Sequence, residues 1–336
     1  MIKVGLIGCG FMGGMHAACY QALESLGVRV VAVADPRESF AKDAAAKSGA
    51  EIYQYGMDLI AKADVDVVDI CLPTDMHVAH AVAAMRAGKH VFIEKPVCKN
   101  EDEMELLLKV EAETGVKVQI GQVIRQWSEY KWLKATVDAG TYGKVLSGSF
   151  RRLSSRPTWA SDGWLLDVNR SGVVAVDMHV HDADFIRYLM GEPTSVKSQA
   201  SRDENGVIMH IMTLYGFENG AAIYSEACWD LPKDYPFTAV YQLRMEKATI
   251  IHDGGITVYP EDGSAPFKPE LPKEYVADND IGGNISDLGG YYNELKYFIE
   301  GLQGKNDLSV ATAAEAVKSV KLVLREAEAA GGLVSK

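Results

Sequence analysis

The stretch that decides the fold is residues 2–13, which read I-K-V-G-L-I-G-C-G-F-M-G. Its apolar first half predicts a β-strand, and a helical pattern follows as far as about residue 26. Between strand and helix, a first glycine permits a tight turn, a second lets a pyrophosphate approach the backbone, and a third lets the helix pack closely on the strand. The predicted contacts to a dinucleotide in this loop are Gly8, Gly10, Phe11, Met12 and Gly13.

An acidic residue follows the next predicted strand at the spacing that this motif needs. The apolar run at 28–34 ends directly before Asp35, 22 residues after Gly13. A carboxylate at this place hydrogen-bonds the adenosine ribose and repels a 2′-phosphate, so the predicted cofactor is NAD. Arg37 lies close enough to bind a 2′-phosphate, so NADP stays an alternative.

The alternation of strands and helices continues to about residue 122. It is typical of βαβ units, and it predicts a doubly wound parallel sheet with helices on both faces, a Rossmann domain. Asn100 with Glu103 forms a predicted capping box, and Gly88 and Gly115 are placed to end helices. The predicted strands are 2–7, 28–34, 65–72, 90–93 and 116–120, and the helices 12–26, 38–48, 76–87 and 100–114.

After residue 122 the pattern changes to long strands joined by turns. We therefore expect a Rossmann domain at 1–122 and an α+β domain with a mostly antiparallel sheet at 123–336. A loop rich in Pro, Asp and Gly is expected at 260–290. The predicted strands are 195–201, 207–217, 221–229, 237–246, 248–251 and 256–259, and the helices 126–139, 173–190, 291–303 and 309–330.

Composition narrows the class of ligand. The formal net charge is −12 and there is no basic run, so a small molecule is a better expected partner than nucleic acid. The five cysteines are scattered without a C-x-x-C pair, which predicts neither a disulfide framework nor a zinc cluster. The chain begins directly with a strand pattern, without a signal-peptide core, and no apolar stretch approaches the ~20 residues of a membrane span. We therefore expect a cytoplasmic protein that does not enter a membrane.

Three further stretches carry a family resemblance. Residues 69–77 read D-I-C-L-P-T-D-M-H, residues 90–96 read H-V-F-I-E-K-P, and residues 177–184 read D-M-H-V-H-D-A-D. Together with the glycine loop they resemble the Gfo/Idh/MocA family, named for glucose-fructose oxidoreductase and inositol dehydrogenase. The last stretch matches the family's D-x-x-x-H signature at Asp177 and His181, and the resemblance covers essentially the whole chain.

The resemblance implies an architecture and roles for single residues. It implies a Rossmann domain followed by a substrate-binding domain with an open sheet, through which the chain forms a homodimer or homotetramer. It places Thr74 and His77 along the nicotinamide half of the cofactor, Glu94 on its ribose and Lys95 toward the substrate. The chain departs from the family directly before Asp177, where S-G-V-V-A-V-D stands in place of a common glycine pair.

The polar run around Asp177 is predicted to be helical. The 18 residues before Gly191 and Pro193 are too many for a typical strand, and this pair is a helix stop. Asp177 and His181 are then i and i+4 on one face, whereas His179 projects away from them. Because His179 and His181 do not converge on a helix, no metal site is predicted, although an H-x-H pair would bind metal on a strand.

This arrangement suits the oxidation of an alcohol. Removal of a hydride from a secondary alcohol also requires a base for the hydroxyl proton, and His181 is the natural candidate. Asp177 can orient the imidazole, and the Lys95 ammonium can stabilise alkoxide character or relay the proton. Either Lys95 or His181 can be the first acceptor. Predicted substrate contacts, with a solvated loop as the alternative for the arginines, are Arg152, Trp164 and Asp184.

The leading hypothesis is an NAD(P)-dependent dehydrogenase that acts on a CH–OH group of a sugar, sugar derivative or cyclitol. Its catalytic residues would be Lys95, Asp177 and His181. One alternative is a glycosidase that uses tightly bound NAD to oxidise its sugar transiently. The other is a regulator that binds NAD without catalysis. The presence of all three catalytic side chains argues against this alternative. The identity of the substrate, the direction of reaction and release of the cofactor stay open.

Overall fold

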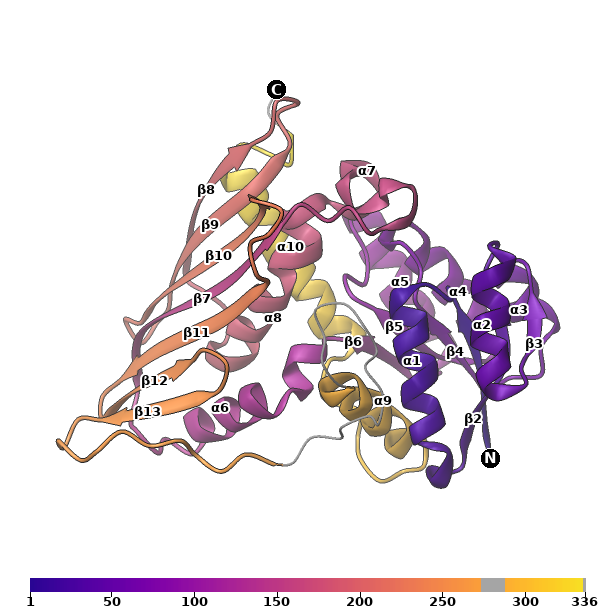
Figure 1. Ribbon diagram of the computed structural model, residues 1–336, viewed down its shortest axis with the longest axis horizontal. Coiled ribbons are helices and arrows are strands. Elements are labelled where there is room, and N and C mark those ends of the chain that lie inside the picture. Colours follow the sequence, from indigo (N-terminus) through magenta and orange to yellow (C-terminus); the bar gives the residue numbers. More distant parts are fainter. Residues whose placement is uncertain (273–287, 335–336) are drawn as a thin grey trace. The chain divides into compact units, whose positions relative to one another are not determined.

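The computed structural model describes residues 1–272 and 288–334, which form two compact units. The described part of the first unit is 1–126 and 288–317, and that of the second is 127–272 and 318–334. Each unit has its own sheet (Figure 1). Within the loop predicted at 260–290, residues 273–287 lie outside the described residues.

The units do not follow the expected division at residue 122, because a late helix returns to the first unit. Helix α9 (Gly289–Leu302) packs against α1 (Phe11–Ala22). Its Phe298 ring contacts Phe92 with 5.6 Å between the ring centroids. An amphipathic pattern shows that a helix buries one face but not which sheet it covers, and this explains the difference.

The first sheet confirms the predicted Rossmann topology. Its six strands are all parallel and lie in the order β3-β2-β1-β4-β5-β6, so the order reverses beside β1. The runs are apolar throughout because helices cover both faces of a parallel sheet. The short edge strand β3 and the helix after it were not predicted, since β3 has only three residues and none is buried. The strands are β1 (Ile2–Ile7), β2 (Val28–Ala34), β3 (Glu51–Tyr53), β4 (Val67–Ile70), β5 (His90–Glu94) and β6 (Val118–Gly121).

Two groups of helices accompany this sheet (Figure 1). Helix α1 packs against α2 and α9, and helix α4 packs against α3 and α5. The predicted cap of α5 is present, because Asn100 Oδ1 accepts the Glu103 N–H at 2.9 Å and Gly115 ends the helix with a φ of 66°. The other helices are α2 (Glu38–Ser48), α3 (Gly56–Lys62), α4 (His77–Arg86) and α5 (Glu101–Thr114).

The second sheet has seven strands in the order β13-β12-β11-β7-β10-β9-β8, and only β7 and β10 pair in parallel. Along β9, Ile211, Thr213 and Tyr215 are buried while the residues between them are less so, which is the alternation of a sheet with one covered face. The strands are β7 (Val145–Ser155), β8 (Ser195–Arg202), β9 (Ile208–Gly216), β10 (Ala222–Leu231), β11 (Thr238–Met245), β12 (Ala248–His252) and β13 (Ile256–Pro260).

Helices cover one face of this sheet (Figure 1). A core forms there around Trp229, whose indole N–H donates to Met178 Sδ at 3.1 Å, and it includes Ile211 and Ala327. The helices are α6 (Ser128–Asp138), α7 (Val168–Ser171), α8 (His179–Met190) and α10 (Ala313–Ala329), whose first residues are grouped with the first unit.

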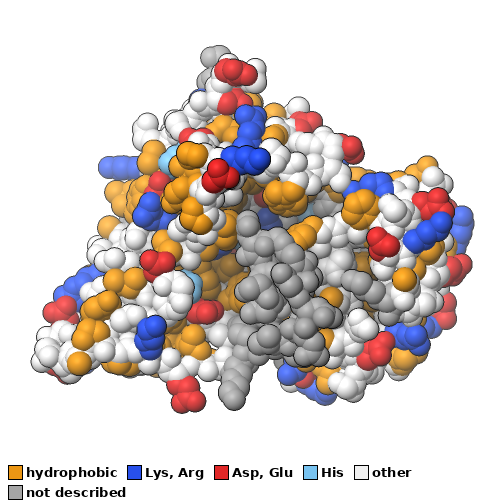
Figure 2. All heavy atoms as spheres, viewed as in Figure 1, with side chains coloured by type: hydrophobic (Ala, Val, Ile, Leu, Met, Phe, Trp, Pro, Cys, Tyr) orange, Lys and Arg blue, Asp and Glu red, His pale blue; other side chains and the backbone are white. Residues whose placement is uncertain are grey.

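The helices of the described chain are shorter than the length needed to cross the hydrocarbon core of a bilayer. The longest in the described part, α10, has 17 residues and carries several charges, whereas a span needs about 20 apolar residues. No helix among the described residues could cross a membrane. On the face drawn in Figure 2, acidic and basic side chains are interspersed.

Candidate active site

Two glycines of the loop, Gly8 and Gly13, have no room for a side chain. Gly8 has a φ of +88°, and a Cβ built on it would lie 2.4 Å from the Cys71 carbonyl oxygen. A Cβ on Gly13 would lie 1.8 Å from the Gly8 carbonyl oxygen. Helix α1 starts at Phe11 after Gly10, and within the described chain no side chain caps it and no acid occupies its first turn. The positive end of the α1 dipole therefore lies at this loop without an acidic neighbour in its first turn, which fits a dinucleotide pyrophosphate.

Asp35 lies at the carboxyl end of β2, as predicted, and it is paired with Arg37. One carboxylate oxygen accepts the Cys9 N–H at 2.9 Å, and the guanidinium of Arg37 donates to both oxygens at 2.9 Å. Burial by itself raises the pKa of Asp35, but the hydrogen bonds from Arg37 and Cys9 lower it below its usual value. Asp35, the predicted determinant for NAD, and Arg37, the possible contact for the 2′-phosphate of NADP, thus form one ion pair. The Arg37 guanidinium also lies over the Phe40 ring, 4.0 Å from its centroid.

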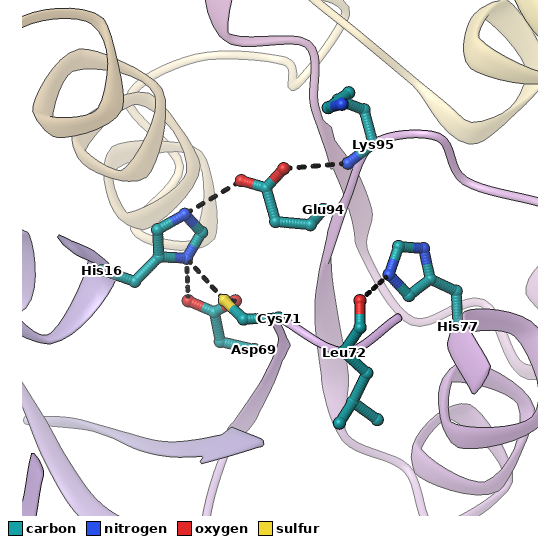
Figure 3. Close-up of polar contacts among 7 residues, drawn as sticks. All are labelled: His16, Asp69, Cys71, Leu72, His77, Glu94 and Lys95. Carbon is teal, nitrogen blue, oxygen red and sulfur yellow. Dashed lines mark hydrogen bonds and ion pairs between the residues drawn. The ribbon is translucent and has the colours of Figure 1, made fainter. Parts of the chain in front are cut away.

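The segment after β4 brings Thr74 and His77 to the same edge of the sheet. The Thr74 hydroxyl is buried, and among the described residues it has no hydrogen-bond partner, so it is suited to a ligand contact. His77 is different, because one ring nitrogen contacts the Leu72 carbonyl oxygen at 2.7 Å (Figure 3). The other ring nitrogen contacts the Pro96 carbonyl oxygen at 2.8 Å. Its ring therefore ties the segment after β4 to the segment after β5, and its contact with the cofactor stays a prediction.

Glu94 and Lys95 end β5 at this edge. Glu94 is buried, its Oε1 lies 3.1 Å from His16 Nε2, and its Oε2 accepts the Lys95 backbone N–H at 3.1 Å (Figure 3). The Lys95 side chain is half-buried. The predicted neighbours Gly8, Glu94 and Lys95 thus belong to one edge of one sheet, the carboxyl edge, where doubly wound folds bind their ligands.

Sequence reasoning missed the partner of Glu94. His16, on the buried face of α1, also contacts Asp69 Oδ2 through Nδ1 at 2.9 Å and Cys71 Sγ at 3.2 Å. Glu294 of α9 lies beside them. The available signal was Asp69, since it interrupts the wholly buried strand β4 and a buried carboxylate requires a partner.

In the second unit, Asp177 and His181 lie on consecutive helical segments. The predicted helix at 173–190 is present, but its first turn, Val174–Met178, is a π-helix, and α8 begins at His179. Val173 precedes it with φ 52° and ψ −157°, a backbone conformation that is ordinarily adopted by glycine. Single π-turns are frequent at functional sites. Asp177 is 8% exposed and His181 is half-buried.

His179 points away from His181, as predicted. Its Nε2 lies 2.6 Å from Glu326 Oε2 on α10, and the same carboxylate accepts the hydroxyls of Tyr215 at 2.8 Å and Thr213 at 3.0 Å. His179 and Glu326 are fully buried. The network joins α8, α10 and β9, so His179 is committed to the fold of the second unit.

The three predicted substrate contacts lie in different settings. Arg152 is buried and donates to both oxygens of Asp182, at 2.9 and 3.0 Å. Asp184 is fully buried and accepts the Ser319 hydroxyl at 2.6 Å. Both are interior residues of the second unit, held by these contacts, and their expected role as ligand contacts stays a prediction. Trp164 is partly buried and packs against the core around Trp229.

Comparisons with known proteins agree with this geometry. Residues 2–122 match the sequence model of the Gfo/Idh/MocA oxidoreductase family with an NAD-binding Rossmann fold, and residues 130–264 match the model of the family's C-terminal domain. The chain is 33% identical over 317 residues to inositol 2-dehydrogenase of Burkholderia vietnamiensis, covering 90% of this chain and 86% of that protein.

Two further matches extend the comparison. The chain is 34% identical over 203 residues to inositol 2-dehydrogenase of Rhizobium meliloti, covering 60% of this chain but only 58% of that protein. A crystal structure described as a myo-inositol dehydrogenase from Sinorhizobium meliloti superimposes with a TM-score of 0.81 at 24% identity, over 98% of both chains. The latter similarity shows the fold alone.

Proposed function

Because the chain belongs to the Gfo/Idh/MocA oxidoreductase family, we propose that it transfers a hydride between a secondary alcohol of a sugar, sugar derivative or cyclitol and NAD. The observation that carries this proposal is the alignment of functional residues at one sheet edge. Ile7, Ile70 and Ile93 are register partners across β1, β4 and β5. The glycine loop, the Thr74 segment and the Glu94-Lys95 pair follow that row directly, where a dinucleotide binds in this topology.

The residues supply what alcohol oxidation needs. NAD, when bound, provides the carbon that accepts the hydride. Lys95 and His181 are the two candidates to accept the proton of the substrate hydroxyl, and Asp177 orients the His181 imidazole. The ammonium of Lys95 also stabilises negative charge as it develops on the substrate oxygen. Inositol as the named substrate of two relatives supports a ligand with several ring hydroxyls.

We also propose an oligomeric state and a cellular location for the protein. The chain would form a homodimer or homotetramer through the seven-stranded sheet. Support for this assembly comes from the exposure of large apolar side chains on the strands of the sheet, Leu146, Leu214 and Tyr259. A cytoplasmic location is supported by the five cysteines, none of which forms a disulfide in the described chain, as is usual in a reducing compartment.

The proposal is tested by mixing the protein and NAD with a panel of inositols, sugars and chromogenic glycosides. We expect the absorbance of reduced nicotinamide to rise with one group of ring alcohols. If a glycoside is cleaved without net formation of NADH, the enzyme is instead a glycosidase that oxidises transiently. A protein that binds NAD and turns over none of these compounds supports the regulator.

The Asp35–Arg37 pair gives a separate prediction about the cofactor. Asp35→Ala is expected to shift the ratio of kcat/KM for NAD and NADP toward NADP by about 10- to 100-fold, since charge-assisted hydrogen bonds contribute about 1.5–3 kcal/mol. The carboxylate that repels the 2′-phosphate is lost, and the Arg37 guanidinium loses the carboxylate to which it donates. The double variant Asp35→Ala/Arg37→Ala should not gain this preference. An unchanged ratio in Asp35→Ala would place the ribose contact elsewhere.

A further inference from the structure

A fully buried histidine lies between two carboxylates beneath the expected cofactor edge. His16 has no exposed surface, and its ring is held from both sides (Figure 3). Nδ1 lies 2.9 Å from Asp69 Oδ2 and Nε2 lies 3.1 Å from Glu94 Oε1. All three residues belong to the first unit, and they link α1 to the ends of β4 and β5.

The contacts of the ring determine its protonation. Carboxylate oxygens only accept hydrogen bonds, and a neutral imidazole has a single N–H, so both contacts are satisfied only by an imidazolium. Burial opposes the charged form, but Asp69 and Cys71 raise the pKa of His16 well above its usual value. The other groups that face it are Tyr20 on α1, Phe92 on β5, and Tyr291 and Glu294 on α9.

Glu294 completes the cluster. Its carboxyl oxygens are buried and have no hydrogen-bond partner among the described residues. A ligand atom from each of His16, Glu94 and Glu294 lies within 4.8 Å of the other two. Burial, and then the neighbouring Glu94, raise the pKa of Glu294 well above its usual value. Burial and the neighbouring carboxylate thus favour the neutral form of Glu294, and the single positive charge of His16 offsets one of the two negative charges of Asp69 and Glu94.

We propose that His16 is a positioning residue, an imidazolium at neutral pH that fixes the carboxylate of Glu94 for cofactor binding, with Glu294 held beside it as a neutral acid. Glu94 is thereby clamped, because Oε1 faces His16 while Oε2 accepts the Lys95 backbone N–H. The space for this arrangement comes from Gly121, where a Cβ would lie 3.1 Å from Glu94 Oε1. The inference rests on the binding of NAD that the proposed function requires.

The charge state is tested without any enzymatic activity. In the protein labelled with ¹⁵N-histidine, the ring signals of His16 are those that disappear in His16→Asn. We expect both nitrogens to be protonated at pH 7.5, because the pKa of His16 is raised well above its usual value. The stabilising contribution of this shift is full below the usual histidine pKa and is lost as the pH rises through the raised value. A neutral tautomer at pH 7.5 would overturn the proposal.

The positioning role is tested by equilibrium binding of NAD in the absence of substrate. His16→Asn is expected to weaken NAD binding roughly tenfold, the loss of one charge-assisted hydrogen bond on Glu94. In the wild type, affinity should also fall as the pH rises through the pKa of His16, and the variant should lack this step. The matched control is His90→Asn, since His90 starts the same strand that Glu94 ends.

Two isosteric substitutions distinguish the charged Glu94 from the neutral Glu294. Glu94→Gln removes a charge and should weaken NAD binding as much as His16→Asn does, whereas Glu294→Gln replaces a group that is already neutral and should change it by less than about twofold. Equal losses of NAD affinity in Glu94→Gln and Glu294→Gln would contradict the proposal, and so would wild-type NAD affinity in His16→Asn. If the wild type binds no NAD, the proposed function fails, while the ring signals of His16 still decide its charge.

Discussion

Replacement of Lys95 by alanine is expected to lower kcat by about 10²- to 10⁴-fold, the usual contribution of a group that moves a proton in the transition state. The affinity for NAD should stay nearly unchanged. Lys95 contacts Glu94 through its backbone N–H, which the substitution preserves. The effect is measured as kcat with saturating substrate and NAD, together with the Kd of NAD.

Lys99→Ala is the matched control for this experiment. Lys99 lies four residues further along the chain, is also half-buried, and forms an ion pair with Glu103 at 3.7 Å. Its removal deletes the same charge but not the proposed proton acceptor, so kcat should stay within about twofold, as for a surface ion pair of small effect. Undiminished turnover in Lys95→Ala would remove Lys95 from the mechanism and leave His181 as the base.

The first unit was predictable because its signals are local. The glycine loop, the capping residues of α5 and the buried runs of a parallel sheet each lie within a few residues of the element they define. Asp35 was found in the same way, since its place is fixed by its distance along the chain from Gly13. For Glu94 and Lys95 the family resemblance implied contacts with the ribose and the substrate, and the structure places both at the sheet edge where the glycine loop lies.

The errors concern contacts between residues that are distant in the sequence. Whether Arg152 faces a ligand or an interior carboxylate depends on Asp182, 30 residues away, and the role of His16 depends on Glu94, 78 residues away. Neither pairing has a periodic signal. The return of α9 to the first unit was missed for the same reason, because helical periodicity does not identify a packing partner.

The start of the Asp177 helix was missed for a different physical reason. A regular helix was expected from residue 173, and the chain instead forms a π-turn at Val174–Met178 after Val173, which has a positive φ. Valine rarely adopts this conformation, so no propensity predicts it. The residue stands near the position where the family commonly has a glycine pair, and its fully buried side chain packs in the core of the second unit.

The Arg152–Asp182 pair carries the largest expected effect on stability. Arg152→Ala should lower the free energy of unfolding by about 3–5 kcal/mol, the cost of leaving one partner of a buried ion pair unpaired. Both side chains are nearly inaccessible, with 7% and 2% of their surfaces exposed. The measurement is urea unfolding of both proteins at neutral pH.

The neighbouring residue on β7 provides the control. Arg151 pairs with Glu226 at 3.0 Å, but 47% of its side chain is exposed, so Arg151→Ala should cost less than about 1 kcal/mol. Adding Asp182→Asn to Arg152→Ala should recover part of the loss, because it removes the uncompensated buried charge. If Arg152→Ala instead unfolds like the wild type and raises the KM of the substrate, Arg152 contacts the ligand and the structural interpretation is wrong. A large loss of stability with recovery in the double variant would show that Arg152 neutralises Asp182, two residues before Asp184 on the helix that carries His181.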